Sequence, residues 1–118
     1  MSTETADYSI QINSDRHLAT IAGSLRLNSP NAYESPFSSI VTLIETEGES
    51  NPVNIDISGL NFLNSSGVTA IAKLILKARE KNASLVVHCN SDIPWQEKTI
   101  PALTKLYQKV SLEYKAPE

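Results

Sequence analysis

The four residues Asn64-Ser65-Ser66-Gly67 are the part of this sequence whose types and spacing best suit chemistry. Asn64 stands where a helix N-cap belongs, because its side chain can accept from the free amides of a first turn. A helix start carries unpaired N–H groups and partial positive charge, so a phosphate on Ser65 or Ser66 is tolerated there. Gly67 weakens a helical turn, which indicates that another group approaches the backbone. The stretch is either an ordinary helix start or a site of serine phosphorylation.

Signals for catalysis are weak elsewhere in the sequence. His17 and His88 both fall in predicted strands, and Cys89 follows His88 directly. Neighbours in a strand point to opposite faces, so these two side chains form no nucleophile–base pair. A lone cysteine is more often a core residue than a nucleophile. Because carboxylates with metal-ligand spacing and glycine-rich phosphate loops are also missing, we expect no catalytic residue, metal or cofactor.

Two further features have both a structural and a functional interpretation. Lys73, Lys77 and Lys81 are spaced four residues apart, which places three cations along one side of a helix. They either keep that side solvated or contact an acidic partner. Trp95 follows Pro94 at a predicted helix start. It is either a hydrophobic brace for that helix or an exposed anchor for a partner.

Length and charge fit one domain covering residues 1–118, with residues 1–7 frayed. The net charge of −3 argues against nucleic acid as a partner. Residues 1–59 hold two basic and eight acidic side chains, whereas residues 60–118 hold eight basic and five acidic ones, which predicts a polarised surface. The single cysteine and the lack of a long apolar run predict a cytoplasmic protein without an internal disulfide or a membrane span.

The hydrophobic periodicity predicts an α/β fold with the element order ββαβαβαβ. We expect strands over 8–12, 17–23, 53–58, 84–89 and 110–114, and helices from near 35–36 to 47, over 65–81, and from a cap at Asp92 onward. Pro101 should split the last helix into two short pieces. The strand over 53–58 alternates strictly between apolar and polar residues, which predicts a mixed, mostly parallel sheet with helices mainly on one face.

The segment VNIDISGLNFLNSSGVTAIAKLILKAREKNASLVV resembles the central block of STAS domains, the family of sulfate transporters and anti-sigma factor antagonists. In that family an apolar strand ends in Asp-Leu-Ser, and Asp-Ser-Ser/Thr-Gly-Leu then opens a helix. This sequence has Asp56-Ile57-Ser58 and Asn64-Ser65-Ser66-Gly67-Val68 at these places. The close match covers residues 53–87. The chain is therefore similar to stand-alone bacterial anti-sigma factor antagonists.

The resemblance implies a non-enzymatic protein of a partner-switching system that takes part in signal transduction. Its partners would be a serine kinase or anti-sigma-type protein, which phosphorylates the antagonist and releases it, and a phosphatase, which restores it. The modified serine of the family maps onto Ser65, with Ser66 as a secondary site. We expect Asn64 and Gly67 to support the site.

We expect the partner to contact the loop and the exposed side of the helix that follows it. The expected contact residues are Ser65, Ser66, Val68, Thr69, Lys73 and Lys77. The motif departs from the family at Asn64, which replaces an Asp and removes a negative charge beside Ser65. The alternative is a STAS module that is not phosphorylated and binds a nucleotide or lipid, or serves as a scaffold subunit.

Overall fold

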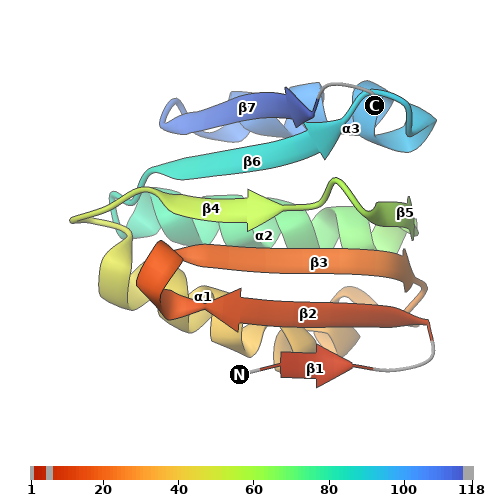
Figure 1. The fold of residues 1–118 in the computed structure, drawn as a ribbon, viewed down its shortest axis with the longest axis horizontal. Coiled ribbons are helices and arrows are strands. Elements are labelled where there is room, and N and C mark those ends of the chain that lie inside the picture. Colours follow the sequence, from red (N-terminus) through yellow and green to blue (C-terminus); the bar gives the residue numbers. More distant parts are fainter. Residues whose placement is uncertain (1, 5–6, 116–118) are drawn as a thin grey trace.

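The computed structural model describes residues 2–4 and 7–115, which form one sheet with helices behind it (Figure 1). The strands are β1 (Ser2–Glu4), β2 (Tyr8–Asn13), β3 (Leu18–Leu25), β4 (Val53–Asp56), β5 (Leu60–Leu63), β6 (Leu85–Asn90) and β7 (Val110–Lys115). The α-helices are α1 (Glu34–Glu47), α2 (Ser65–Glu80) and α3 (Pro94–Leu103). Three short 3-10 helices are η1 (Ser14–Arg16), η2 (Pro30–Tyr33) and η3 (Thr104–Leu106).

The strand order across the sheet is β1-β2-β3-β4-β6-β7, with β5 paired to β3 beyond the end of β4. The pairs of β2 with β1 and with β3 are antiparallel. The pairs β3–β4, β3–β5, β4–β6 and β6–β7 are parallel. The prediction of a mixed, mostly parallel sheet is therefore confirmed.

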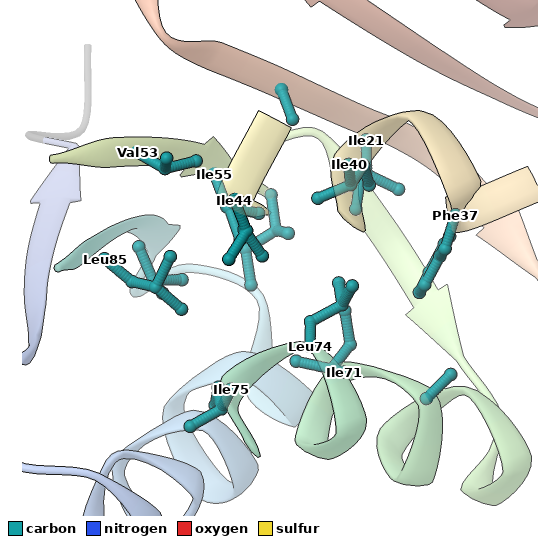
Figure 2. Packing of buried hydrophobic residues seen from close by; sticks show 14 of the residues in the cluster. Ile21, Phe37, Ile40, Ile44, Val53, Ile55, Ile71, Leu74, Ile75 and Leu85 are labelled. Atoms are coloured by element: carbon teal, nitrogen blue, oxygen red, sulfur yellow. The ribbon is translucent and has the colours of Figure 1, made fainter. Parts of the chain in front are cut away.

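All three α-helices lie on the same side of the sheet, as the alternation in β4 predicted (Figure 1). Val53 and Ile55 are buried beneath the helices, whereas Asn54 and Asp56 face the other side and are half-buried. Side chains from α1, α2 and the central strands meet in one apolar core (Figure 2). Burial of each large aliphatic side chain in such a core contributes about 1.5–3 kcal/mol.

Two strands were missed, so the predicted order ββαβαβαβ becomes βββαββαβαβ. Ser2–Glu4 form strand β1 against β2 instead of a frayed end, whereas residues 1, 5 and 6 of the segment expected to fray lie outside the described residues. Leu60–Leu63, for which we expected no strand, form β5. β4 ends early because Asp56 Oδ1 accepts from the amide and the hydroxyl of Ser58, at 2.9 and 2.6 Å, and this turn interrupts the strand.

Three local predictions also need correction. Asp92 does not cap α3, because the N-cap position is Ile93, which makes no side-chain cap bond. Pro101 does not split the helix: α3 continues to Leu103 and then tightens into η3. A proline so close to the end of a helix removes few hydrogen bonds. His17 lies just before β3, in a left-handed turn with φ of 51°, rather than in the strand.

Candidate functional site

Asn64 holds the start of α2 through both ends of its side-chain amide. Its Oδ1 accepts from the amide of Gly67 at 2.9 Å, which makes it the N-cap that the sequence predicted. The same oxygen accepts from the hydroxyl of Tyr33 at 2.7 Å. Its Nδ2 donates to the carbonyl of Leu27 at 2.8 Å. We call Tyr33, Asn64 and Leu27 the clasp.

The clasp forms because two parallel strands end side by side. Leu25 and Leu63 pair at the ends of β3 and β5, so the segments that follow leave the sheet at the same edge. The amide of Asn64 donates to the carbonyl of Leu25 at 3.2 Å, which continues this pairing by one residue. Tyr33 arrives from η2 and also accepts from the amide of Leu27 at 3.3 Å. The clasp therefore joins three segments at the start of α2.

The clasp accounts for an asparagine at this position. An amide side chain donates through nitrogen and accepts through oxygen at the same time, whereas a carboxylate only accepts. With an aspartate in place of Asn64, one carboxylate oxygen would lie against the carbonyl oxygen of Leu27. Burial raises the pKa of the Tyr33 hydroxyl, so it remains a neutral donor to Asn64 at physiological pH.

Gly67 is required because two side chains pack against the backbone of α2. A Cβ at Gly67 would collide with the side chain of Leu63 and lie 2.8 Å from the Tyr33 hydroxyl. The expectation that something approaches this backbone is confirmed. The group that approaches belongs to the protein itself, and the glycine alone is no evidence for a ligand.

The two serines of the motif open α2 with unoccupied hydroxyls. Ser65 is exposed and Ser66 is half-buried. In the part of the chain that the structure describes, neither hydroxyl has a hydrogen-bond partner. Their backbone amides belong to the first turn, which has no intrahelical acceptors. Neither hydroxyl is engaged within the described structure, and the first-turn amides beside them are donors of the kind that suits a phosphate.

The other predicted contact residues lie along α2 on different sides of the helix. Thr69 and Lys73 are exposed, and the Thr69 hydroxyl donates to the carbonyl of Ser65 at 3.2 Å. Lys77 is half-buried near α1. Val68 is half-buried and packs against the hydrophobic core. The structure therefore aligns Ser65, Thr69 and Lys73 on the outer side of α2, apart from Val68.

Several neighbours of the site were not predicted from the sequence. Tyr33 and the Leu27 carbonyl belong to a loop with no motif of its own. Phe62 is 40% exposed, and the Arg26 guanidinium lies 4.6 Å from the centre of its ring, a cation–π contact beside the clasp. Phe62 was the sequence feature that could have indicated this exposed aromatic contact. Aromatic residues are common in ordinary strands, so its presence there did not stand out.

The first turn of α3 supports the segment that leads to the site. Gln96 is fully buried, and its Nε2 donates to the carbonyls of Ile57 and Leu60 at 2.6 and 3.0 Å. Its Oε1 accepts from the amide of Asn90 at 2.8 Å. Trp95 Nε1 donates to the Leu60 carbonyl at 3.0 Å, and its ring packs against the core. Trp95 is thus a brace, the structural one of its two interpretations.

The histidines and the cysteine do not form a reactive group. Cys89 is fully buried, and burial, with the charge of Asp56, raises the pKa of its thiol to about 11. His88 faces the open side of the sheet, where its Nε2 lies 3.0 Å from Asn54 Oδ1. Within residues 2–4 and 7–115, no three His, Cys, Asp or Glu side chains are placed to hold a metal ion. Among the described helices, none has the length and apolar character needed to span a bilayer.

Comparison with known proteins identifies the class. The family model of the STAS domain matches residues 19–110, so this chain belongs to the STAS domain family. A comparison with curated proteins gave no significant match.

Solved structures share the fold at low sequence identity. One is a chain from the Pseudomonas aeruginosa complex of the diguanylate cyclase SiaD with its activator SiaC, with a TM-score of 0.66, 12% identity, and 98% of this chain and 99% of that chain covered. SiaC of Pseudomonas aeruginosa alone has a TM-score of 0.61 and 15% identity, with 96% and 95% covered. An anti-sigma-factor antagonist (STAS) domain protein from Planctomyces limnophilus has a TM-score of 0.57 and 15% identity, with 95% and 92% covered.

Proposed function

We propose that this STAS domain is a non-enzymatic regulatory protein of a partner-switching system, and that phosphorylation of Ser65 controls its binding to a partner protein. The observation that carries the proposal is the Ser65 hydroxyl, which is exposed and without a partner in the described structure. It lies at a helix start held rigid by the clasp. Ser66 is the secondary site, since its hydroxyl is also unoccupied but half-buried.

The physical basis of the switch is a change of charge at a surface that loses water on binding. A phosphate adds about −1.5 to −2 charge to Ser65 at neutral pH. The first-turn amides and the partial positive charge of the helix stabilise that phosphate in the free protein. In a complex the same charge would be buried without a matching cation, which costs several kcal/mol. Phosphorylation therefore releases the partner without any change of fold.

The proposed partner is a serine kinase of the anti-sigma type, with a phosphatase that reverses the modification. The complex of SiaD with its activator SiaC supports a second kind of output, because a chain of that complex shares this fold over 98% of the present chain. On this alternative, the partner whose binding is controlled by phosphorylation of Ser65 is a diguanylate cyclase. Both versions use the same surface around Ser65.

The direct test is phosphorylation in vitro by a serine kinase encoded near this gene, followed by mass spectrometry of the modified peptide. Wild type should carry its phosphate mainly on Ser65, and Ser65→Ala should abolish release of the partner and leave at most a weaker modification at the secondary site, Ser66. Ser66→Ala is the matched control and should keep both phosphorylation and release. Unchanged phosphorylation and release in Ser65→Ala would show that the assignment to Ser65 is wrong.

A charge mimic tests the interface without a kinase. Ser65→Asp should weaken binding to the partner in a titration, because the added carboxylate lies on the contact surface. The matched control is Ser91→Asp, an exposed serine after β6 that we place outside that surface. Equal affinity of wild type and Ser65→Asp would contradict the placement of Ser65 in the interface.

A further inference from the structure

A groove runs between α1 and α2, starting next to the clasp. It has a volume of about 160 Å³, and Phe37, Val41, Ala70 and Leu74 line it together with Tyr33. These residues come from both helices, so the groove lies along their line of contact. Because Tyr33 lines the groove and also donates to Asn64 in the clasp, the groove lies next to the start of α2.

The size and direction of the groove suit one large apolar side chain presented by a helix. A cavity of about 150 Å³ lined by apolar side chains accepts a benzene molecule, so a Phe or Leu side chain fits here. The lining on α2 extends from Ala70 to Lys77, which is about 10 Å at 1.5 Å per residue. That length corresponds to about two turns of a docked helix, the usual arrangement for an amphipathic helix in a groove.

The charges at the rim indicate what surrounds that apolar side chain. Lys73 is exposed, and none of the described acidic residues forms an ion pair with it. Lys77 lies 4.0 Å from Glu45 and 3.6 Å from Glu80, distances typical of weak surface pairs. Glu34 is an exposed carboxylate on the α1 side of the groove, opposite in sign to the two lysines. The α2 rim presents one unpaired cation and one weakly paired cation, so it is this rim that complements a carboxylate on a partner.

We infer that the groove between α1 and α2 receives a helical segment of the partner protein, which inserts one large apolar side chain beside Phe37 and Leu74 and places a carboxylate next to Lys73. The inference rests on the proposed function, because it names the chemistry of the partner at the same surface. It adds the α1 side of the contact, including Val41, to the residues expected from the sequence.

An acidic partner segment also explains how a phosphate on the motif is sensed along α2. Ser66 lies seven residues before Lys73, and Ser65 eight, so the phosphate and Lys73 are about 10–12 Å apart along the helix. This distance exceeds the Debye length of about 8 Å at physiological ionic strength, so the phosphate has little effect on the field of Lys73 through solvent. Partner carboxylates that bind between Ser65 and Lys73 lie closer to the phosphate, and its charge of about −1.5 to −2 repels them.

A pair of small probes of opposite charge tests the inference without a known partner. 3-Phenylpropionate carries a ring for the groove and a carboxylate for Lys73, and 3-phenylpropylamine is its matched cationic control. In methyl-detected NMR titrations, the acid should perturb Val41, Ala70 and Leu74. It should bind about fivefold or more tightly than the amine, as expected for one exposed charge pair of about 1 kcal/mol.

Three variants separate the groove from the charge. Val41→Trp should fill the groove and abolish binding of both probes. Lys73→Glu, an exposed substitution that should not disturb folding, should reverse the preference from the acid to the amine. Lys98→Glu is the matched control, since Lys98 is exposed on α3, away from the groove, and should leave both affinities unchanged.

Several outcomes would overturn the inference. They are the absence of perturbation, perturbation away from the groove, and equal binding of acid and amine. Decanoate binding tenfold more tightly than the aromatic acid would assign the groove to a lipid chain. Concentration-dependent dimers that Val41→Trp abolishes would assign it to a second copy. A failed phosphorylation experiment would refute the proposed switch and leave the NMR result unaffected. A partner that binds Val41→Trp as tightly as wild type would refute the groove as its binding site and leave the switch untouched.

Discussion

The hydroxyl of Tyr33 donates a 2.7 Å hydrogen bond to Oδ1 of Asn64, which joins the end of η2 to the start of α2. Asn64 in turn binds the Leu27 carbonyl and the Gly67 amide, so one side chain fixes the backbone on both sides of the serine pair. A switch that works through charge requires such a rigid setting, because a mobile loop would move the phosphate away from the contact surface.

Tyr33→Phe should lower the free energy of unfolding by about 1–2 kcal/mol, because the amide of Leu27 loses its acceptor and Asn64 loses a donor. Urea denaturation at 25 °C measures the change. Tyr114→Phe is the control, since Tyr114 is 46% exposed and removal of its hydroxyl should change the free energy of unfolding little. Hydrogen exchange at the Gly67 amide should also become faster in Tyr33→Phe alone. Equal stability of the two variants would contradict the role given to the clasp.

Asn64→Asp, which restores the residue usual in the family, should destabilise this protein by about 1 kcal/mol. It loses the bond to the Leu27 carbonyl and sets two oxygens against each other, a cost of about 1–3 kcal/mol. A negative charge at the start of α2 stabilises the helix by about 0.3–1 kcal/mol, which is too little to offset the lost hydrogen bond and the repulsion between the oxygens. Asn61→Asp, an exposed control in β5, should be within experimental error of wild type. A more stable Asn64→Asp would refute this account of the asparagine.

Gly67→Ala should destabilise the protein by about 1–3 kcal/mol, because the added methyl group collides with Leu63 and crowds Tyr33. Alanine favours a helix by about 1 kcal/mol over glycine, so a stabilised variant would mean that the contacts relax freely. Gly59→Ala is the matched control. Its Cβ would lie 3.4 Å from that of Ala22, an ordinary contact, and thermal unfolding should show little change.

Stability should fall with alkaline pH because of Cys89. Its pKa is raised by burial from 9.0 to about 11, so the folded protein keeps a proton that the unfolded chain loses. The contribution is complete below pH 9 and disappears as the pH rises through 11, at about 1.4 kcal/mol per pH unit. Urea denaturation between pH 8 and 10 should show this slope in wild type and a shallower one in Cys89→Ala. Identical slopes would show that the thiol does not couple to folding.

Much of the fold could be predicted from local patterns. Strict alternation in β4 and the 3.6-residue period of α2 determine which sides are buried, and these patterns are visible in the sequence. β5 could not be predicted in the same way, because the Asp56–Ser58 turn that separates it from β4 is a side-chain hydrogen bond. Pro101 is tolerated because α3 ends two residues later, at Leu103. The position of the proline in the sequence did not predict this boundary.

The local features of the site could be predicted from the sequence, but its contacts between distant segments could not. Asn64 as the cap and the serines as the first helical residues followed from helix-start chemistry. Tyr33 and Leu27 lie 31 and 37 residues before Asn64 and reach it only because β3 and β5 end together. The reason for Asn64 instead of Asp is therefore a tertiary contact, and no local pattern contains it.

The central claim is that a phosphate on Ser65 releases the partner. The most direct measurement is a calorimetric titration of the partner with two forms of this protein, one unmodified and one with phosphoserine incorporated at position 65 during translation. The same phosphoserine at Ser91 serves as the control. We predict an affinity at least tenfold weaker, about 1.4 kcal/mol, for the form phosphorylated at Ser65 and no change for the control. Equal affinity of the unmodified and Ser65-phosphorylated proteins would contradict the account.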